Sequence, residues 1–317
     1  MKRGRLGRTE VRVTELGFGG APIGNLYAPV SDEQARAAVD AAWDAGVRYF
    51  DTAPHYGLGL SEQRLGAALR DRPRTEYAIS TKVGRLLVPN PAPHGSDLEV
   101  GGFAVPDTLT RVFDFSRDGV RRSLESSLKR LGLDRIDIVL IHDPDDHLDV
   151  ALAEAVPALV ELREQGVVGA VGVGMNAVSP LLRFAAESDV DVVMVAGRWT
   201  LLDRTAAPLL DACWDRRIDV FSAAPFNSGL LAAEQPAAGT RFNYAPAPPE
   251  LLADARRYAE LARAYGVTLP QLALRFPLRH PAVASVVAGM ATPEQSVADA
   301  AWLAEPVPEN LWDLVAP

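Results

Sequence analysis

The sequence predicts an α/β protein whose parallel strands close into a (β/α)8 barrel. Short apolar runs rich in β-branched residues alternate with segments of helical periodicity, a pattern typical of a parallel sheet covered by helices. Eight such runs occur, and eight parallel strands are the number that closes this barrel. A chain of 317 residues is long enough for two domains, but the unbroken rhythm favours one domain over residues 1–317.

The expected elements follow one another along the whole chain. The strands are expected at 15–20, 47–50, 77–81, 136–141, 167–173, 190–195, 218–222 and 283–287. Between them, helical periodicity predicts helices that include 32–45, 117–131, 150–164 and 249–265. Ser31 with Gln34, and Thr292 with Gln295, indicate capping boxes at two helix starts.

Two long segments interrupt this rhythm. Residues 85–116 are rich in Pro and Gly, and residues 226–249 are rich in Ala and Pro. They follow the third and seventh expected strands and therefore belong to the face where the strands of a barrel end, which is where barrel enzymes carry their active sites. Loops of this length in a compact domain are usually functional. We expect both to border the active site.

Composition excludes several classes of protein. A formal charge of -9 and a pI near 5.1 leave no basic field for nucleic acid. No apolar run approaches the ~18 residues of a membrane span, and we expect no secretory signal, because polar and charged residues follow the charged N-terminus. The single thiol, Cys213, has no disulfide or zinc-binding partner, so we expect it in the core of a cytoplasmic protein.

Ionisable residues stand where three expected strands end. These are Asp51, Lys82 and His142, and Tyr56 follows Asp51 on the next loop. The chain has 29 Arg and only three Lys, so a lysine at a strand end indicates a compact ammonium with a tunable proton. Each residue alone also has a structural explanation: an ion pair for Lys82, a turn cap for Asp51, packing for Tyr56 and a hydrogen bond for His142.

Together these residues resemble the Asp, Tyr, Lys and His tetrad of the aldo-keto reductase superfamily. The matching stretches are 49–57, 80–84 and 140–145, with further matches at 16–20, 61–66, 123–128 and 130–134. The resemblance covers nearly the whole chain. It implies a (β/α)8 barrel with an N-terminal β-hairpin, a nicotinamide cofactor and Asp51, Tyr56, Lys82 and His142 as the catalytic residues.

Within that superfamily the chain resembles the branch of D-threo-aldose 1-dehydrogenases, also called L-fucose dehydrogenases. The stretches that carry this resemblance are 83–87, 113–118, 142–145, 174–176 and 224–231. It implies oxidation of the anomeric carbon of a free aldose, of the L-fucose, D-arabinose or L-galactose type, to a lactone. The alternatives are a pyridoxal 4-dehydrogenase, a general aldehyde or ketone reductase, or a cofactor-binding regulatory subunit without significant turnover.

The chemistry is coherent for these four residues. Hydride leaves carbon as the attached hydroxyl loses its proton, so a base must stand within ~3 Å of that oxygen. A free tyrosine, with a pKa near ~10, is too weakly ionised for this at neutral pH. We expect Tyr56 to be the base, the Lys82 ammonium to favour its phenolate, Asp51 to hold Lys82, and His142 to orient the substrate oxygen.

The resemblance also implies cofactor contacts. Asn176 would bind the nicotinamide carboxamide, with loop capping as the alternative. The tyrosine that often stacks on nicotinamide appears here as Ala223 or Ala224. The positions where NADP-dependent relatives carry Lys and Arg are Gly289 and Gln295, so we expect NAD as the preferred cofactor, with NADP as the alternative. Further expected contacts are Gly20, Asp51, Met175, Ala224, Pro225, Phe226, Asn227, Gly229, Leu231, Met290 and Asp299.

Substrate contacts are expected from His55, Phe115 and Trp199 near the strand ends. The substrate is a small sugar or aldehyde, and no nucleic acid or membrane partner is expected. A metal-dependent barrel hydrolase is the competing enzyme class, because His55 and the polar segment 142–147 supply His and Asp ligands. A solvated surface loop is the simpler explanation of that segment, so no metal site is expected. The superfamily default is a monomer.

Overall fold

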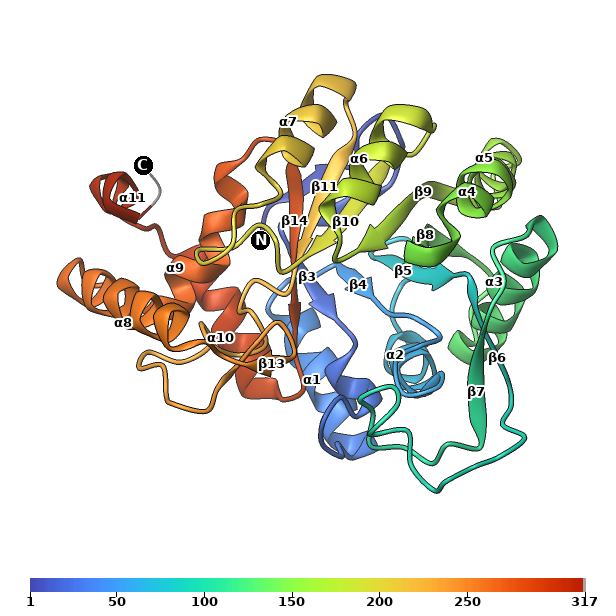
Figure 1. The fold of residues 1–317 in the computed structure, drawn as a ribbon, viewed down its shortest axis with the longest axis horizontal. Coiled ribbons are helices and arrows are strands. Elements are labelled where there is room, and N and C mark those ends of the chain that lie inside the picture. Colours follow the sequence, from blue (N-terminus) through green and yellow to red (C-terminus); the bar gives the residue numbers. More distant parts are fainter. Residues whose placement is uncertain (316–317) are drawn as a thin grey trace.

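The computed structural model describes residues 1–315 and contains the predicted (β/α)8 barrel (Figure 1). Its strands are all parallel, each pairs with the next along the chain, and the last pairs with the first. The strands are β3 (Leu16–Gly19), β4 (Tyr49–Asp51), β5 (Ala78–Val83), β8 (Ile136–His142), β9 (Val168–Met175), β10 (Val192–Ala196), β11 (Asp219–Ala223) and β14 (Val283–Gly289). The predicted fold class is therefore confirmed.

Helices surround the barrel, most of them as its outer layer, and α8 (Pro249–Ala264) and α11 (Glu309–Val315) lie further out (Figure 1). The others are α1 (Asp32–Asp44), α2 (Leu60–Leu69), α3 (Arg117–Leu131), α5 (Val156–Glu164), α6 (Val178–Glu187), α7 (Ala207–Arg216), α9 (Leu269–Arg275) and α10 (Pro293–Ala304). Helix α3 has the predicted bounds because Ser116 caps its N-terminus and Gly132, at φ +64°, ends it. None of the helices in residues 1–315 combines the length and hydropathy of a membrane span.

The helix predicted at 150–164 is not a single α-helix. It begins as α4 (Leu148–Val150), continues as a π-helical turn (Ala151–Ala155) and only then becomes α5. Pro157 explains the change, because proline has no N–H to donate to the preceding turn.

The two predicted capping boxes are only half formed. Ser31 and Thr292 accept from the backbone N–H groups of Gln34 and Gln295, as expected. Both glutamine side chains turn instead to Ala291: the amide of Gln34 donates to its carbonyl at 3.0 Å, and Gln295 accepts from its N–H at 2.7 Å. The two glutamines therefore fix the loop that follows β14.

The end of the barrel opposite the strand C-termini is closed. An antiparallel hairpin of β1 (Arg3–Arg5) and β2 (Arg12–Thr14), the hairpin that the resemblance implies, carries Leu6 and Val13 into the barrel interior. There they pack in one cluster with Tyr49 and Phe221. Because this layer fills the barrel, only the C-terminal end of the strands is left for a site.

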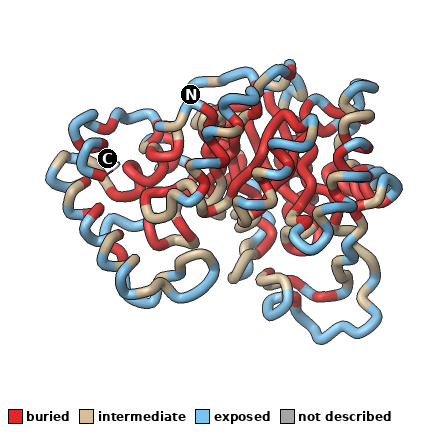
Figure 2. The backbone as a smooth tube through the Cα atoms, turned by 45° about the horizontal axis from the view of Figure 1, so that its top comes forward, coloured by how far each residue is buried: buried red, intermediate tan, exposed pale blue. Residues whose placement is uncertain are grey.

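The two segments expected to be long loops contain short sheets. β6 (Arg85–Pro89) and β7 (Leu109–Phe113) pair antiparallel in the first, and β12 (Arg241–Phe242) and β13 (Ala245–Pro246) in the second. Both leave the barrel after the strand C-termini, as expected (Figure 1). Figure 2 shows much of their backbone exposed, whereas the barrel strands are buried.

Candidate active site

Three of the four expected catalytic residues meet at one buried ammonium. Nζ of Lys82 lies 2.7 Å and 3.0 Å from the two carboxylate oxygens of Asp51 and 3.1 Å from the hydroxyl of Tyr56. Lys82 and Asp51 are each only 2% exposed. Asp51 pairs with Ser80 on the neighbouring strand, and Lys82, two residues further on, faces the same side of β5. Strand register thus brings the ion pair together.

A close backbone contact holds Tyr56 in place beside this pair. Gly57, which follows Tyr56, has φ +62°, and a Cβ there would lie 2.2 Å from the carbonyl oxygen of Gly24. Only glycine permits this approach. The turn after β4 is therefore pressed against the segment that follows β3, with the Tyr56 phenol directed at Lys82.

The proton affinities of these groups follow from burial and charge. Burial acts to lower the pKa of Lys82, but Asp51 and Tyr56 together outweigh it and the pKa is raised, so Lys82 stays charged. Burial raises the pKa of Tyr56 to about 12, although Lys82 acts to lower it. Lys82 thus favours the phenolate, as its position predicted, but burial is the larger effect.

Two neutral histidines stand beside Tyr56. The His142 ring lies edge-on to the Tyr56 ring at 5.9 Å between centroids, and the His55 ring lies 5.6 Å from that of His142. Burial, followed by the positive charge of Arg85, holds the pKa of His142 well below its usual value. Burial and Arg111 lower the pKa of His55 to about 2. Both rings therefore act as neutral hydrogen-bonding groups.

An ion pair that the sequence reasoning missed completes the surroundings of His142. Nη2 of Arg85, the first residue of β6, lies 2.6 Å from the carboxylate of Asp143, which is itself 3.5 Å from Nε2 of His142. Within residues 1–315, buried Nε of Arg85, Nδ1 of His55 and Nδ1 of His142 have no hydrogen-bond partner. The available signal was a charged residue directly after Gly84 at a strand end.

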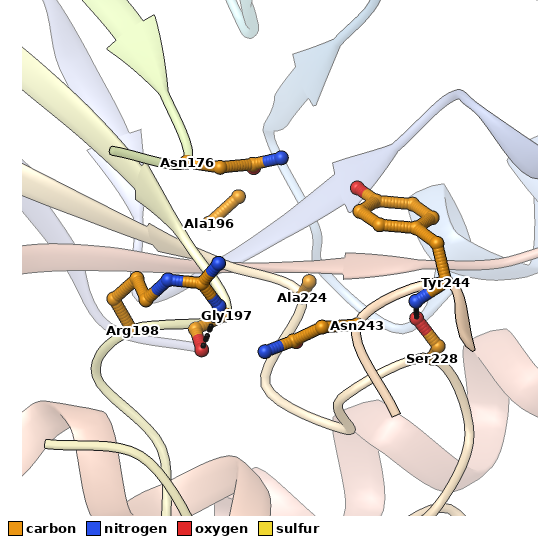
Figure 3. Close-up of a pocket in the computed structure, with 8 residues that line it drawn as sticks. All are labelled: Asn176, Ala196, Gly197, Arg198, Ala224, Ser228, Asn243 and Tyr244. Atoms are coloured by element: carbon orange, nitrogen blue, oxygen red, sulfur yellow. Dashed lines mark hydrogen bonds between the residues drawn. The ribbon is translucent and has the colours of Figure 1, made fainter. Parts of the chain in front are cut away.

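A small pocket lies between the ends of β9, β10 and β11 (Figure 3). It has a volume of about 40 Å³, and its lining residues are Asn176, Ala196, Gly197, Arg198, Ala224, Ser228, Asn243 and Tyr244. The Asn176 amide points toward the hydroxyl of Tyr244 across the pocket (Figure 3). Asn176 and Ala224 were expected near the cofactor, whereas Arg198, Asn243 and Tyr244 were not singled out.

Other residues expected near the cofactor take different positions. Gly20 donates to the Asp51 carbonyl at 2.8 Å, and a Cβ there would lie 2.7 Å from that oxygen. Asn227 donates to Gly197 and to Asn243, which holds the loop after β11 in place. Met175, Leu231 and Met290 are buried in apolar clusters, Pro225 is buried, Phe226 is half-buried, Gly229 has φ +102°, and Gly289 is exposed.

One observation tests whether this face fits a dinucleotide. Asp299 is 3% exposed, and burial raises its pKa to about 7, with no charge or hydrogen bond among the described residues to offset it. A carboxylate without a donor on a nearly buried side chain fits a ligand that supplies N–H or O–H groups, as an adenosine moiety does. Asp299 on α10 and Asn176 after β9 would hold the two ends of such a molecule.

Two of the expected substrate contacts serve packing. Phe115 is 3% exposed and covers Gly84, where a Cβ would lie 2.1 Å from its ring. The Trp199 indole donates to the Pro277 carbonyl at 3.2 Å and packs on Phe276, so the structure does not bring it to Tyr56. Aromatic residues near strand ends fill gaps between layers as readily as they line a site, which the sequence pattern does not distinguish.

Comparison with known proteins agrees with this geometry. Residues 15–314 match the Aldo/keto reductase family. The chain is 48% identical to a D-threo-aldose 1-dehydrogenase of a Pseudomonas species, over 95% of this chain and 92% of that protein. It is 39% identical to a pyridoxal 4-dehydrogenase of Microbacterium luteolum, over 97% and 94%. A holo aldo-keto reductase of Bacillus halodurans has the same fold, with a TM-score of 0.77, 25% identity, and 99% and 96% coverage.

Proposed function

The chain belongs to the aldo/keto reductase family and is an oxidoreductase, and we propose that it oxidises the anomeric carbon of a free aldose to the lactone with NAD. The candidate sugars are of the L-fucose, D-arabinose or L-galactose type. The similarity to a D-threo-aldose 1-dehydrogenase supports this choice.

The polar surroundings of Tyr56 carry the proposal. Buried polar atoms without partners are rare in folded proteins, yet three of them, on Arg85, His55 and His142, gather here among residues 1–315. A sugar hydroxyl both donates and accepts, so neighbouring hydroxyls suit such a set. A simple aldehyde would leave most of these atoms as unpaired as they are in the free protein, so it would gain less binding free energy here than a sugar. The site therefore favours a polyhydroxylated substrate.

The side chains divide the proton chemistry among them. Tyr56 accepts the proton of the anomeric hydroxyl, the Lys82 ammonium at 3.1 Å stabilises the phenolate, and Asp51 keeps Lys82 charged and in place. Neutral His142 hydrogen-bonds the substrate oxygen and directs it at Tyr56. When bound, a nicotinamide dinucleotide supplies the acceptor for the hydride of the anomeric carbon.

Charge at the loop after β14 supports NAD over NADP. Residues 288–299 contain no Lys or Arg, and Glu294 adds a negative charge at the start of α10. Gln295 already accepts from the Ala291 N–H at 2.7 Å. A 2'-phosphate needs an ammonium or guanidinium group to neutralise it. This loop therefore suits the free ribose hydroxyl of NAD.

The state of the cysteine supports a cytoplasmic location for the enzyme. The one cysteine, Cys213, is buried, and burial raises its pKa to about 12, so it is an inert thiol of the kind that suits the cytoplasm. We propose a single-domain monomer over residues 1–317.

Steady-state reduction of NAD and of NADP tests the proposal. L-Fucose, D-arabinose, L-galactose and pyridoxal are assayed side by side with each cofactor. We expect the highest kcat/KM for one of the three sugars, with NAD favoured over NADP by tenfold or more. Faster oxidation of pyridoxal than of every sugar would replace the sugar assignment, and an NADP preference of tenfold would overturn the cofactor assignment.

A further inference from the structure

Tyr244 lies in the turn between β12 and β13 and borders the pocket of Figure 3. We propose that its ring forms the aromatic wall against which the nicotinamide ring lies. This inference rests on the nicotinamide-dependent function proposed above. The end of β11 has no aromatic side chain that could lie against the nicotinamide, because its residues there are Ala223 and Ala224.

The backbone at Tyr244 is held in an unfavourable conformation. Phe242 pairs with Ala245, so Asn243 and Tyr244 are the two residues of a tight hairpin turn, at φ +45° and +73°. Turns with two positive φ values favour Asn followed by Gly. Asn243 meets this preference, but a bulky side chain stands where glycine would be relaxed. Such local strain is typical of residues kept for function.

Polar contacts fix the position of this turn. The Tyr244 N–H donates to Oγ of Ser228 at 3.0 Å, and Oδ1 of Asn243 accepts from Nδ2 of Asn227 at 3.2 Å. The guanidinium of Arg241 lies 4.5 Å from the centre of the Tyr27 ring, in the segment after β3. The turn therefore spans the barrel mouth, with the Tyr244 ring in a defined place above it.

The two ends of the Tyr244 side chain have different environments. Burial of the hydroxyl end raises the pKa of Tyr244, as does the Asp143 carboxylate, whereas Asn176, Arg198 and Lys82 act to lower it. The phenol thus reaches toward the catalytic residues. Yet Tyr244 as a whole is 57% exposed, so its ring keeps an open face. An exposed ring beside Asn176 and Ala224 is placed to receive a planar ligand.

The charge of the nicotinamide ring should make this contact affect NAD+ and NADH binding differently. An oxidised nicotinamide ring is cationic and a reduced one is neutral, and the face of a tyrosine ring attracts cations. Tyr244 therefore strengthens binding of NAD+ more than binding of NADH. A residue that only maintained the shape of the loop would affect both forms equally.

The test compares two substitutions, with dissociation constants for NAD+ and NADH measured by titration calorimetry. Tyr244→Gly removes the ring and relaxes the turn, so we expect the thermal midpoint of the free protein to be kept or raised. We expect its affinity to fall roughly five- to tenfold for NAD+ and about twofold for NADH. Tyr244→Phe keeps the ring and should bind both forms within about twofold of the parent.

Arg217→Gly is the matched control, because Arg217 is an exposed residue at φ +60° at the end of α7, where glycine relaxes the backbone without touching the pocket. It should leave both dissociation constants unchanged. Equal loss of NAD+ and NADH affinity in Tyr244→Gly, unchanged affinity or tighter binding would overturn the inference. Failure of the parent protein to bind either form would contradict the proposed function itself.

Discussion

Lys82 determines the charge balance of the site at the scale of single residues. Its ammonium contacts both Asp51 and Tyr56. Lys82 and Asp51 are buried, whereas Tyr56 is only half-buried. The opposing influences on Tyr56 are a neighbouring cation, which lowers its pKa, and burial, which raises it further. In the free protein the phenol is therefore protonated at neutral pH, and oxidation depends on the small fraction that is ionised.

This balance predicts the pH dependence of the reaction. The pKa of Tyr56 is about 12, so the phenolate fraction grows as pH rises toward that value. We expect kcat/KM for sugar oxidation to increase about tenfold per pH unit between pH 7 and 9. Because His142 is neutral throughout, no additional acid limb should appear near pH 6.5. Initial rates under saturating NAD from about pH 5.5 to about pH 9 check both expectations. A flat profile would mean that another group is the base.

The sequence predicts the positions of the site residues better than it predicts their pKa values. Asp51, Lys82 and His142 were recognised because they directly follow apolar runs, and the structure brings Asp51, Lys82 and Tyr56 together. The net pKa of Tyr56 depends on how many atoms surround it in three dimensions, which a linear pattern does not contain. The same is true of Trp199, whose direction is set by Phe276 and Pro277, far along the chain.

At the scale of elements, the β6–β7 hairpin builds one wall of the site. Arg111 on β7 makes a two-point ion pair with Asp97, at 2.6 Å and 2.7 Å, and also donates to the His55 carbonyl at 3.0 Å. These side chains are only 11% and 4% exposed. The hairpin could not be predicted from the sequence for two reasons. Its strands have only five residues each and give little periodic signal, and the segment between them is rich in Pro and Gly.

Removing the ion pair between Asp97 and Arg111 should loosen the β6–β7 hairpin without disturbing the barrel. Asp97→Ala leaves the Arg111 charge buried without its partner, which costs about 3–5 kcal/mol locally. We expect KM for the sugar to rise roughly tenfold, and residues 85–116 to become sensitive to limited proteolysis. Asp254→Ala, which breaks an exposed pair with Arg257 on α8, is the control and should change neither property. An unchanged KM in Asp97→Ala would show that the hairpin does not shape the substrate site.

At the scale of the whole molecule, the barrel is predictable because its strand and helix periods repeat and one topology accommodates them. The positions of buried charges within the barrel are harder to predict from the sequence. Asp299 is buried and Asp219 is half-buried, and burial raises their pKa values to about 7 and about 6. Their positions in α10 and at the start of β11 do not reveal burial in the sequence, since neither is flanked by a recognisable partner.

These carboxyl groups predict how stability changes with pH. Asp299 binds its proton more tightly when folded than when unfolded, where its pKa is near ~3.9, so stability falls as pH rises from about 4 to 7. Asp299→Asn removes this penalty and should raise the free energy of unfolding by about 2–4 kcal/mol at pH 8 and by little at pH 4. Urea denaturation at both values measures it. A gain of equal size at both would contradict the burial of a charged Asp299.

The most direct test of the account is the substitution Tyr56→Phe, which removes one oxygen from the site and leaves the ring. Sugar-dependent reduction of NAD and the dissociation constant for NADH are measured on the same preparation. If Tyr56 is the base, turnover falls roughly a thousandfold or more while NADH binds within about twofold of the parent. Turnover within tenfold of the parent protein would contradict the central claim that this phenol moves the proton.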